Sequence, residues 1–163
     1  MSGTVSNDDL ALLIASFVDE VKPFLAGIRR GAAGIFALGR DAQAITAARS
    51  SLATIAASAQ VFDLPAVRQL AELAQQVDEA FGAVERGAVP DEARAPLLAM
   101  VDNLDAQLDG LLAGDERGRE RLDKGYELLE RVVQAVEQAE ETAPPELAID
   151  LDALLATLGP AAA

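Results

Sequence analysis

Large apolar residues recur at alternating intervals of three and four residues along most of this chain, and this spacing constrains the fold more than any other feature. Such spacing places one apolar stripe along an α-helix, and the stripe is buried when helices pack together. Runs of β-branched residues with a period of two are missing, so the pattern predicts an all-α protein. The clearest stripe comprises Ile45, Ala48, Leu52, Ile55, Ala59 and Phe62.

Proline and glycine set the limits of the predicted helices. Asp41 is suited to cap the central helix at its N terminus, and Pro65 follows its end. Pro65 then opens a third helix, which we expect to end near Gly87 because glycine favours the position after a last turn. We expect the regular part of a fourth helix to start near Ala95, with Pro96 in its first turn.

The first helix carries a proline within its apolar stripe. We expect this helix to begin near Ser6–Asp9. Pro23 removes one backbone hydrogen bond, and it should bend the helix rather than end it because the stripe resumes in phase. Three glycines then weaken the continuation. The sequence leaves open whether the helix ends near Arg30 or continues past Phe36 toward Gly39.

The last third of the chain has a different character. Acidic and basic residues four apart, together with a narrower apolar stripe, predict an amphipathic helix over residues 115–142. A narrow stripe suits packing on the outside of a bundle or on a second chain. Beyond Pro144 and Pro145, residues 146–158 fit either a docking peptide or a cap on the end of the bundle. The stripe of the amphipathic helix comprises Leu122, Tyr126, Leu129, Val133 and Val136. One helical face of the tail carries Leu151, Leu154, Leu155 and Leu158.

These segments predict an up-down antiparallel four-helix bundle over residues 7–113, an additional amphipathic helix over residues 115–142, and a Pro-containing linker with a short acidic tail over residues 143–163. The net charge of −14 makes nucleic acid and anionic membranes unsuitable partners. No apolar run is long enough to span a bilayer, and the first 20 residues lack the basic start of a signal peptide. We therefore expect a cytoplasmic protein.

The chain contains no histidine and no cysteine, which excludes several kinds of chemistry. Without histidine the chain cannot relay phosphate through an imidazole, and it cannot build a serine–histidine or cysteine–histidine nucleophile. It also cannot bind a metal through histidine or thiolate ligands. No glycine-rich phosphate loop has the required spacing. We predict no catalytic residue, no metal, no cofactor and no enzymatic activity. The carboxylate pairs, which we expect on solvated surface, are Asp8/Asp9, Asp19/Glu20 and Asp102/Asp105.

The side of the central helix away from its apolar stripe is built mainly from small residues, which allow another surface to approach the backbone. Alanine is also the best helix former, so the same residues fit an ordinary solvent-facing surface. They equally fit a face covered by the additional C-terminal helix. These residues are Ser50, Ala53, Ala56, Ala57 and Gln60.

The segment Ala53–Ala59, with its close Phe62–Leu64, resembles the second helix of histidine-containing phosphotransfer (HPt) domains, as found at the N terminus of chemotaxis-type histidine kinases. In that family the helix reads His-x-hydrophobic-Lys-Gly-Ser-Ala. Ile55 holds the hydrophobic position, whereas Ala53 replaces the phosphoacceptor histidine and Ala56 replaces the lysine. The likeness extends over residues 10–113 in helix lengths and spacing, but only this segment matches a motif.

The resemblance implies an HPt-like module that cannot accept phosphate and that acts in two-component signalling by binding a receiver domain or a histidine kinase. Arg49 and Arg68 would complement the acidic pocket of a receiver. Two alternatives remain. One is a structural or oligomerisation scaffold, self-associating through residues 115–142 and forming the N-terminal segment of a larger histidine-kinase-like protein. The other is a small-molecule or metal-binding bundle, which the missing histidine disfavours. The implied partner-binding face comprises Ser50, Ala53, Ala56, Ala57, Gln60, Arg49 and Arg68.

Overall fold

The computed structural model describes residues 6–142, and every regular element in this range is helical. The all-α prediction is therefore confirmed for the described part of the chain. The predicted linker and tail, residues 143–163, lie outside it. The elements are α1 (Asn7–Val21), α2 (Phe24–Ile35), α3 (Ala42–Gln60), α4 (Pro65–Arg86), the 3-10 helix η1 (Asp91–Ala93), α5 (Arg94–Ala113) and α6 (Gly118–Thr142).

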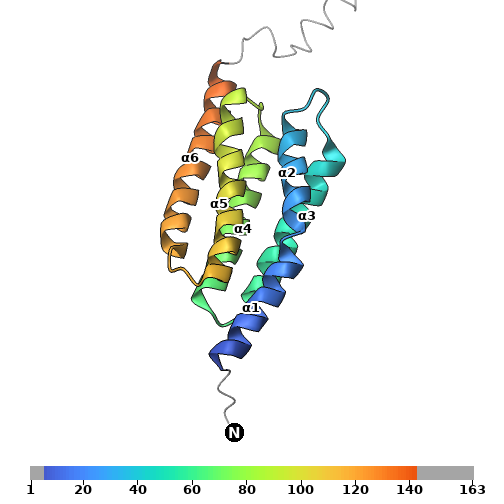
Figure 1. Ribbon diagram of the computed structural model, residues 1–163. Coiled ribbons are helices and arrows are strands. Elements are labelled where there is room, and N and C mark those ends of the chain that lie inside the picture. Colours follow the sequence, from blue (N-terminus) through green and yellow to red (C-terminus); the bar gives the residue numbers. More distant parts are fainter. Residues whose placement is uncertain (1–5, 143–163) are drawn as a thin grey trace, which may run out of the picture.

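Helices α1 and α2 form one bent rod (Figure 1). Lys22 and Pro23 between them keep right-handed helical backbone angles, with φ of −52° and −60°. The Lys22 amide still donates to the Val18 carbonyl at 2.8 Å, and the Leu25 amide donates to the Lys22 carbonyl at 3.1 Å. The chain bends at Pro23 as predicted, but α1 ends at Val21 and α2 begins at Phe24, so the expectation that Pro23 would not end the helix is wrong. The rod ends at Ile35, between the two limits that the sequence left open.

Local signals place the starts of α1, α3 and α4 as predicted, whereas α3 ends at Gln60, so Phe62 lies beyond the helix to which its stripe was assigned. The Ser6 hydroxyl accepts a hydrogen bond from the Asp9 amide at 3.1 Å and caps α1. The Asp41 carboxylate accepts one from the Ala44 amide at 3.1 Å and caps α3. Each cap satisfies a backbone N–H that has no partner within its helix. Pro65 occupies the first turn of α4.

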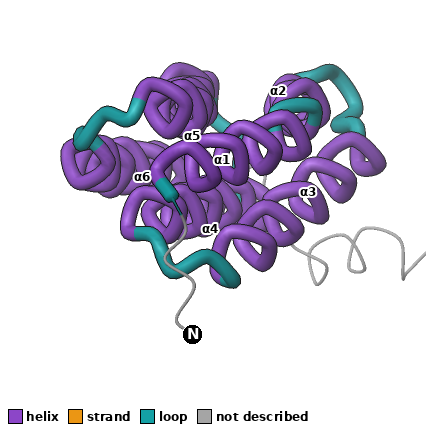
Figure 2. The backbone as a smooth tube through the Cα atoms, turned by 60° about the horizontal axis from the view of Figure 1, so that its bottom comes forward, coloured by secondary structure: helices purple, strands orange, loops and turns teal. Residues whose placement is uncertain are grey.

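The helices assemble into a bundle around one apolar core. Helix α3 packs between α2 and α4, α6 packs on α4 and α5, and α5 also contacts α1 and α2 (Figures 1 and 2). Helix α4 thus has α3 on one side and α6 on the other. The largest fully buried side chains include Phe81, Ile28, Leu52, Ile55, Leu70 and Leu104. Leu52 and Ile55 belong to the predicted stripe of the central helix, so the helical periodicity correctly identified this part of the core.

The predicted stripe of α6 is wrong in part. Tyr126 is 56% exposed, and Leu129 is only half-buried. Relative to the predicted orientation, α6 is turned about its axis so that Gly125, and not Tyr126, faces α4. A Cβ atom at Gly125 would lie 1.8 Å from Gln76 Oε1. A glycine carries no apolar signal in the sequence, yet it allows the closest approach of two helices. The residues that α6 buries are Gly118, Leu122, Gly125, Leu128, Val132 and Val136.

Candidate partner-binding face

Apart from its two arginines, the predicted face lies on the outer side of α3, and four of these five residues are exposed there. The fifth, Ala56, is 8% exposed and lies at the base of a groove beside α4, which corrects its placement on the open surface. Helix α6 packs on α4 and α5, so it does not cover this face, and that alternative is wrong. The exposed residues are Ser50, Ala53, Ala57 and Gln60.

A shallow groove of about 320 Å³ separates α3 from α4. Four of its eight lining residues are alanines, three on α3 and one on α4. Asp78 provides the charged edge of this groove and holds Arg49 across it. The residues that line the groove are Leu52, Ala53, Ala56, Ala57, Gln60, Ala74, Gln75 and Asp78.

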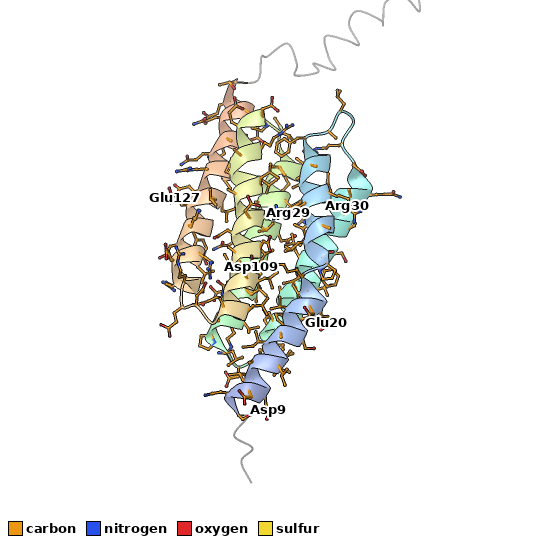
Figure 3. The ribbon with its side chains drawn as sticks, viewed as in Figure 1. Asp9, Glu20, Arg29, Arg30, Asp109 and Glu127 are labelled. Atoms are coloured by element: carbon orange, nitrogen blue, oxygen red, sulfur yellow. The ribbon has the colours of Figure 1, made fainter. Side chains whose placement is uncertain are left out.

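A larger groove of about 480 Å³, which we call the α1–α3 groove, lies on the other side of Ala57. Two of its apolar residues are largely open to solvent, since Val61 is 82% exposed and Leu13 is 48% exposed. Glu20 stands on α1 at its edge (Figure 3). The lining residues are Leu13, Ser16, Phe17, Glu20, Ala57, Ser58, Val61 and Phe62.

The sequence prediction missed the α1–α3 groove. The sequence held one indication of this groove. Leu13 and Val61 are large apolar residues that belong to none of the predicted stripes. An aromatic pair fixes one part of the groove wall, with the rings of Phe17 and Phe62 4.9 Å apart and tilted by 59°. Pairs in this geometry stabilise by about 0.5–1.5 kcal/mol beyond their buried area. Ala57 lines both grooves and so joins them into one continuous surface.

The two predicted arginines are already paired within the chain. Arg49 Nε lies 2.8 Å from Asp78 Oδ1, and Arg49 Nη1 lies 2.7 Å from Glu85 Oε2. The hydrogen bond to Asp78 is the largest cause of the raised pKa of Arg49. Arg68 Nη2 lies 2.8 Å from Asp63 Oδ1 in an exposed pair. Either arginine must leave its own carboxylate to meet that of a partner.

Of the candidate carboxylate pairs, Asp102 and Asp105 form ion pairs within the described part of the chain. Arg29 contacts Asp102 at 2.6 Å and Asp105 at 3.2 Å, and Lys22 contacts both Asp105 and Asp109. Figure 3 shows Arg29 and Asp109 among the side chains at the junction of the bent rod with α5. These ion pairs join the rod to α5, and desolvation is slight because the groups are partly exposed. Residues 6–142 contain no group of three acidic side chains placed to hold a metal ion.

Comparisons with family models, with curated proteins and with solved structures found no match to this chain. Across residues 6–142, none of the helices combines the length and the apolar character needed to cross a membrane. Function must therefore be inferred from the residues and their geometry.

Proposed function

We propose that this chain is a non-phosphorylatable HPt-like module that acts by protein contact in cytoplasmic, chemotaxis-type two-component signalling. Its partner would be a receiver domain or a histidine kinase, bound on the outer side of α3. The observation that carries the proposal is the continuous surface around Ala57, which is built from small residues and lies between two grooves. It coincides with the segment that resembles the HPt motif.

In this proposal, the rod α1–α2 and helices α3, α4 and α5 are the four members of an up-down antiparallel bundle, and α6 is the additional helix. The packing of α2 on α3, of α3 on α4 and of α4 on α5 supports this assignment, because consecutive helices joined by short loops pack as antiparallel neighbours.

Binding without phosphate would use shape and apolar contact. Ala53 places a methyl group where the family carries its imidazole, so no phosphoryl group can be accepted at this position. The small side chains of α3 would let a partner helix approach closely. Leu13 and Val61 would then lose their contact with water, at about 25 cal/mol for each Å² of apolar surface removed.

The test is a titration of the isotope-labelled protein with candidate receiver domains, followed by amide chemical shifts. We expect shifts on Ser50, Ala53, Ala57 and Gln60, with further shifts along the α1–α3 groove. Ala57→Arg should weaken binding about 30-fold, as expected at the centre of an interface for a loss of about 2 kcal/mol. It should change the free energy of unfolding by less than about 0.5 kcal/mol, because Ala57 is exposed.

Ala47→Arg is the matched control, since it adds the same side chain at an exposed position of α3 that lines neither groove. It should leave receiver binding unchanged. Equal losses for both variants would mean that added charge, and not the surface around Ala57, governs binding. No binding by any receiver or kinase tested would remove the proposal.

The scaffold alternative remains a prediction. Helix α6 buries its apolar stripe against α4 and α5 of the same chain, so self-association through residues 115–142 would use its outer side, where Tyr126 is 56% exposed. A molecular mass that rises with concentration, and that falls to the monomer value for Tyr126→Glu, would favour this alternative.

A further inference from the structure

A second apolar groove lies between α2 and α5, away from the α3 face. We call it the α2–α5 groove, and its volume is about 320 Å³. Phe36 and Leu98 are half-buried at its base, whereas Ala33 and Ala37 leave its side open to solvent. The lining residues are Ala32, Ala33, Phe36, Ala37, Arg94 and Leu98.

Arg94 gives this groove a cationic edge. Its guanidinium carbon lies 5.0 Å from the centre of the Phe36 ring, so the ring holds the charge beside the apolar base. Its ion pair with Asp91 spans 4.0 Å, and the Arg94 side chain is 52% exposed. A cationic edge beside an apolar base is complementary to an acidic amphipathic segment.

Helix α6 ends at the same end of the bundle at which α2 ends and α5 begins (Figure 1). The groove is lined by residues from these ends of α2 and α5. Thr142, the last residue of α6, lines a small hollow together with Pro90 and Glu92. Arg94 follows Glu92 by two residues and begins α5. Thr142, which precedes the 21 residues 143–163 in the sequence, therefore lies near the start of α5, where Arg94 lines the groove.

We propose that residues 146–158 dock in the α2–α5 groove of their own chain as a short helix. The leucine face would contact Phe36 and Leu98. Asp150 and Asp152 flank that face on opposite sides, so one of the two would lie toward Arg94. This inference goes beyond the proposed function and does not depend on it. The leucines are Leu151, Leu154, Leu155 and Leu158, and the acidic residues are Glu146, Asp150 and Asp152.

The reach of the chain favours this groove over the α1–α3 groove. Phe62 lies three residues before Pro65, the first residue of α4, and Gly118, the first residue of α6, faces Gln69 near that start. The α1–α3 groove therefore lies toward the end where α6 begins. The 25 residues of α6 carry Thr142 about 37 Å from that end. Nine residues from Thr142 to Leu151 span at most about 30 Å when fully extended.

A spin label on the full-length chain tests the docking directly. The protein has no cysteine, so Ala153→Cys creates a single labelling site. A helical period of 3.6 residues places position 153 opposite the leucine face. We expect the label to broaden the amide signals of Ala33, Ala37 and Leu98 strongly, and those of Ser16 and Ser58 weakly. Uniform broadening, or strongest broadening at Ser16 and Ser58, would overturn the proposal.

Two matched pairs of variants examine the chemistry in the labelled chain. Leu155→Asp should abolish the selective broadening, whereas Ala156→Asp adds the same charge at the next position, off the leucine face, and should preserve it. Arg94→Glu should reduce the broadening. Arg119→Glu makes the same charge change far from the groove, at a side chain of α6 that is 82% exposed, and should leave the broadening unchanged. Equal responses within either pair would contradict the proposed contacts.

Mixing isotopes separates docking in the same chain from docking between chains. Spin-labelled protein without isotopes is mixed with isotope-labelled protein without a spin label. We expect no selective broadening in the mixture. Broadening of Ala33 and Leu98 there would assign the groove to the tail of a second copy and overturn docking within one chain.

Discussion

Two helix contacts in this protein are built around a glycine, but they meet different kinds of partner. Where α2 meets α3, a Cβ atom at Gly31 would lie 2.3 Å from Ala48 Cβ and 2.9 Å from the Ala44 carbonyl oxygen. Where α6 meets α4, a Cβ atom at Gly125 would lie 1.8 Å from Gln76 Oε1. The first glycine faces a fixed backbone, and the second faces the end of a buried side chain.

The contrast shows two ways of fixing how helices pack. The α2–α3 contact relies on shape alone, so any added atom must displace a helix. The α6 contact relies on hydrogen bonds from buried amides, since Gln76 Nε2 donates to the Leu122 carbonyl at 3.1 Å and Asn103 Nδ2 donates to the Arg121 carbonyl at 2.7 Å. Such groups are costly when unpaired, so they select one position of α6 along α4 and α5.

The same polar contacts continue at the start of α6. Gln107 Nε2 donates to the Ala66 carbonyl at 2.9 Å, and Gln107 Oε1 accepts from Arg121 Nη1 at 2.9 Å. Arg121 also pairs with Asp115 at 2.6 Å. One amide therefore links α4, α5 and α6. We expect the two contacts to respond differently to substitution and to pH.

Gly31→Ala should have the largest effect. The new methyl group meets Ala48 and backbone of α3, and overpacking of this kind costs about 1–3 kcal/mol. Gly27→Ala is the matched control on the same helix, because its Cβ would meet only Arg30 Nη2 at 3.9 Å. Alanine favours a helix more than glycine does at both positions, but only Gly31→Ala meets a close neighbour. Gly27→Ala should therefore stabilise the folded state by up to about 1 kcal/mol. Denaturant unfolding measures both, and two changes of the same sign would contradict the close approach at Gly31.

Gly125→Ala should destabilise the folded state less than Gly31→Ala does, by about 1 kcal/mol. The Gln76 side chain can turn away from the new methyl group, and the cost is the loss of its hydrogen bond to the Leu122 carbonyl. In a Gln76→Ala background the obstacle is gone, and the same substitution should become neutral or stabilising. A double-mutant cycle of unfolding free energies reports this coupling. Additive effects would show that Gln76 does not limit the approach of α6.

Asp115→Asn should have a smaller effect that depends on pH. The Arg121 guanidinium lowers the pKa of Asp115 to about 2. Because the unfolded-state pKa of an aspartate is about 3.9, the ion pair stabilises the fold above about pH 4 and loses this contribution as the pH falls through about 2. Urea unfolding between pH 5 and 2 should show the difference between wild type and variant shrinking. A constant difference would contradict the low pKa.

The same pH series sharpens the comparison between the two contacts. Gly31, Ala44 and Ala48 carry no titratable side chain. The cost of Gly31→Ala should therefore stay constant over the interval in which the effect of Asp115→Asn disappears. A matching pH dependence for both would mean that acid acts on the whole bundle and not on the start of α6.

The amino-acid sequence alone predicted the helical class, most helix limits and, except for Phe62, the buried stripe of α3. These depend on neighbours a few residues away, such as the Asp41 side chain that caps its own helix or the ring of Pro65 that fits a first turn. It left open whether the residues Ser50, Ala53, Ala57 and Gln60 of α3 are exposed or covered, and the structure shows that they are exposed.

Three features could be seen only in the folded structure. They are the face that α6 buries, the ion pairing of Arg49 and the groove that α1 and α3 enclose at Val61. Each depends on partners far along the chain, as when Gln76 meets Leu122 across 46 residues. Periodicity reports that a helix has an apolar side, but the partner that lies against it depends on how whole helices fit together. Gly125 shows the reason, because its importance comes from the side chain it lacks and the amide that fills the space.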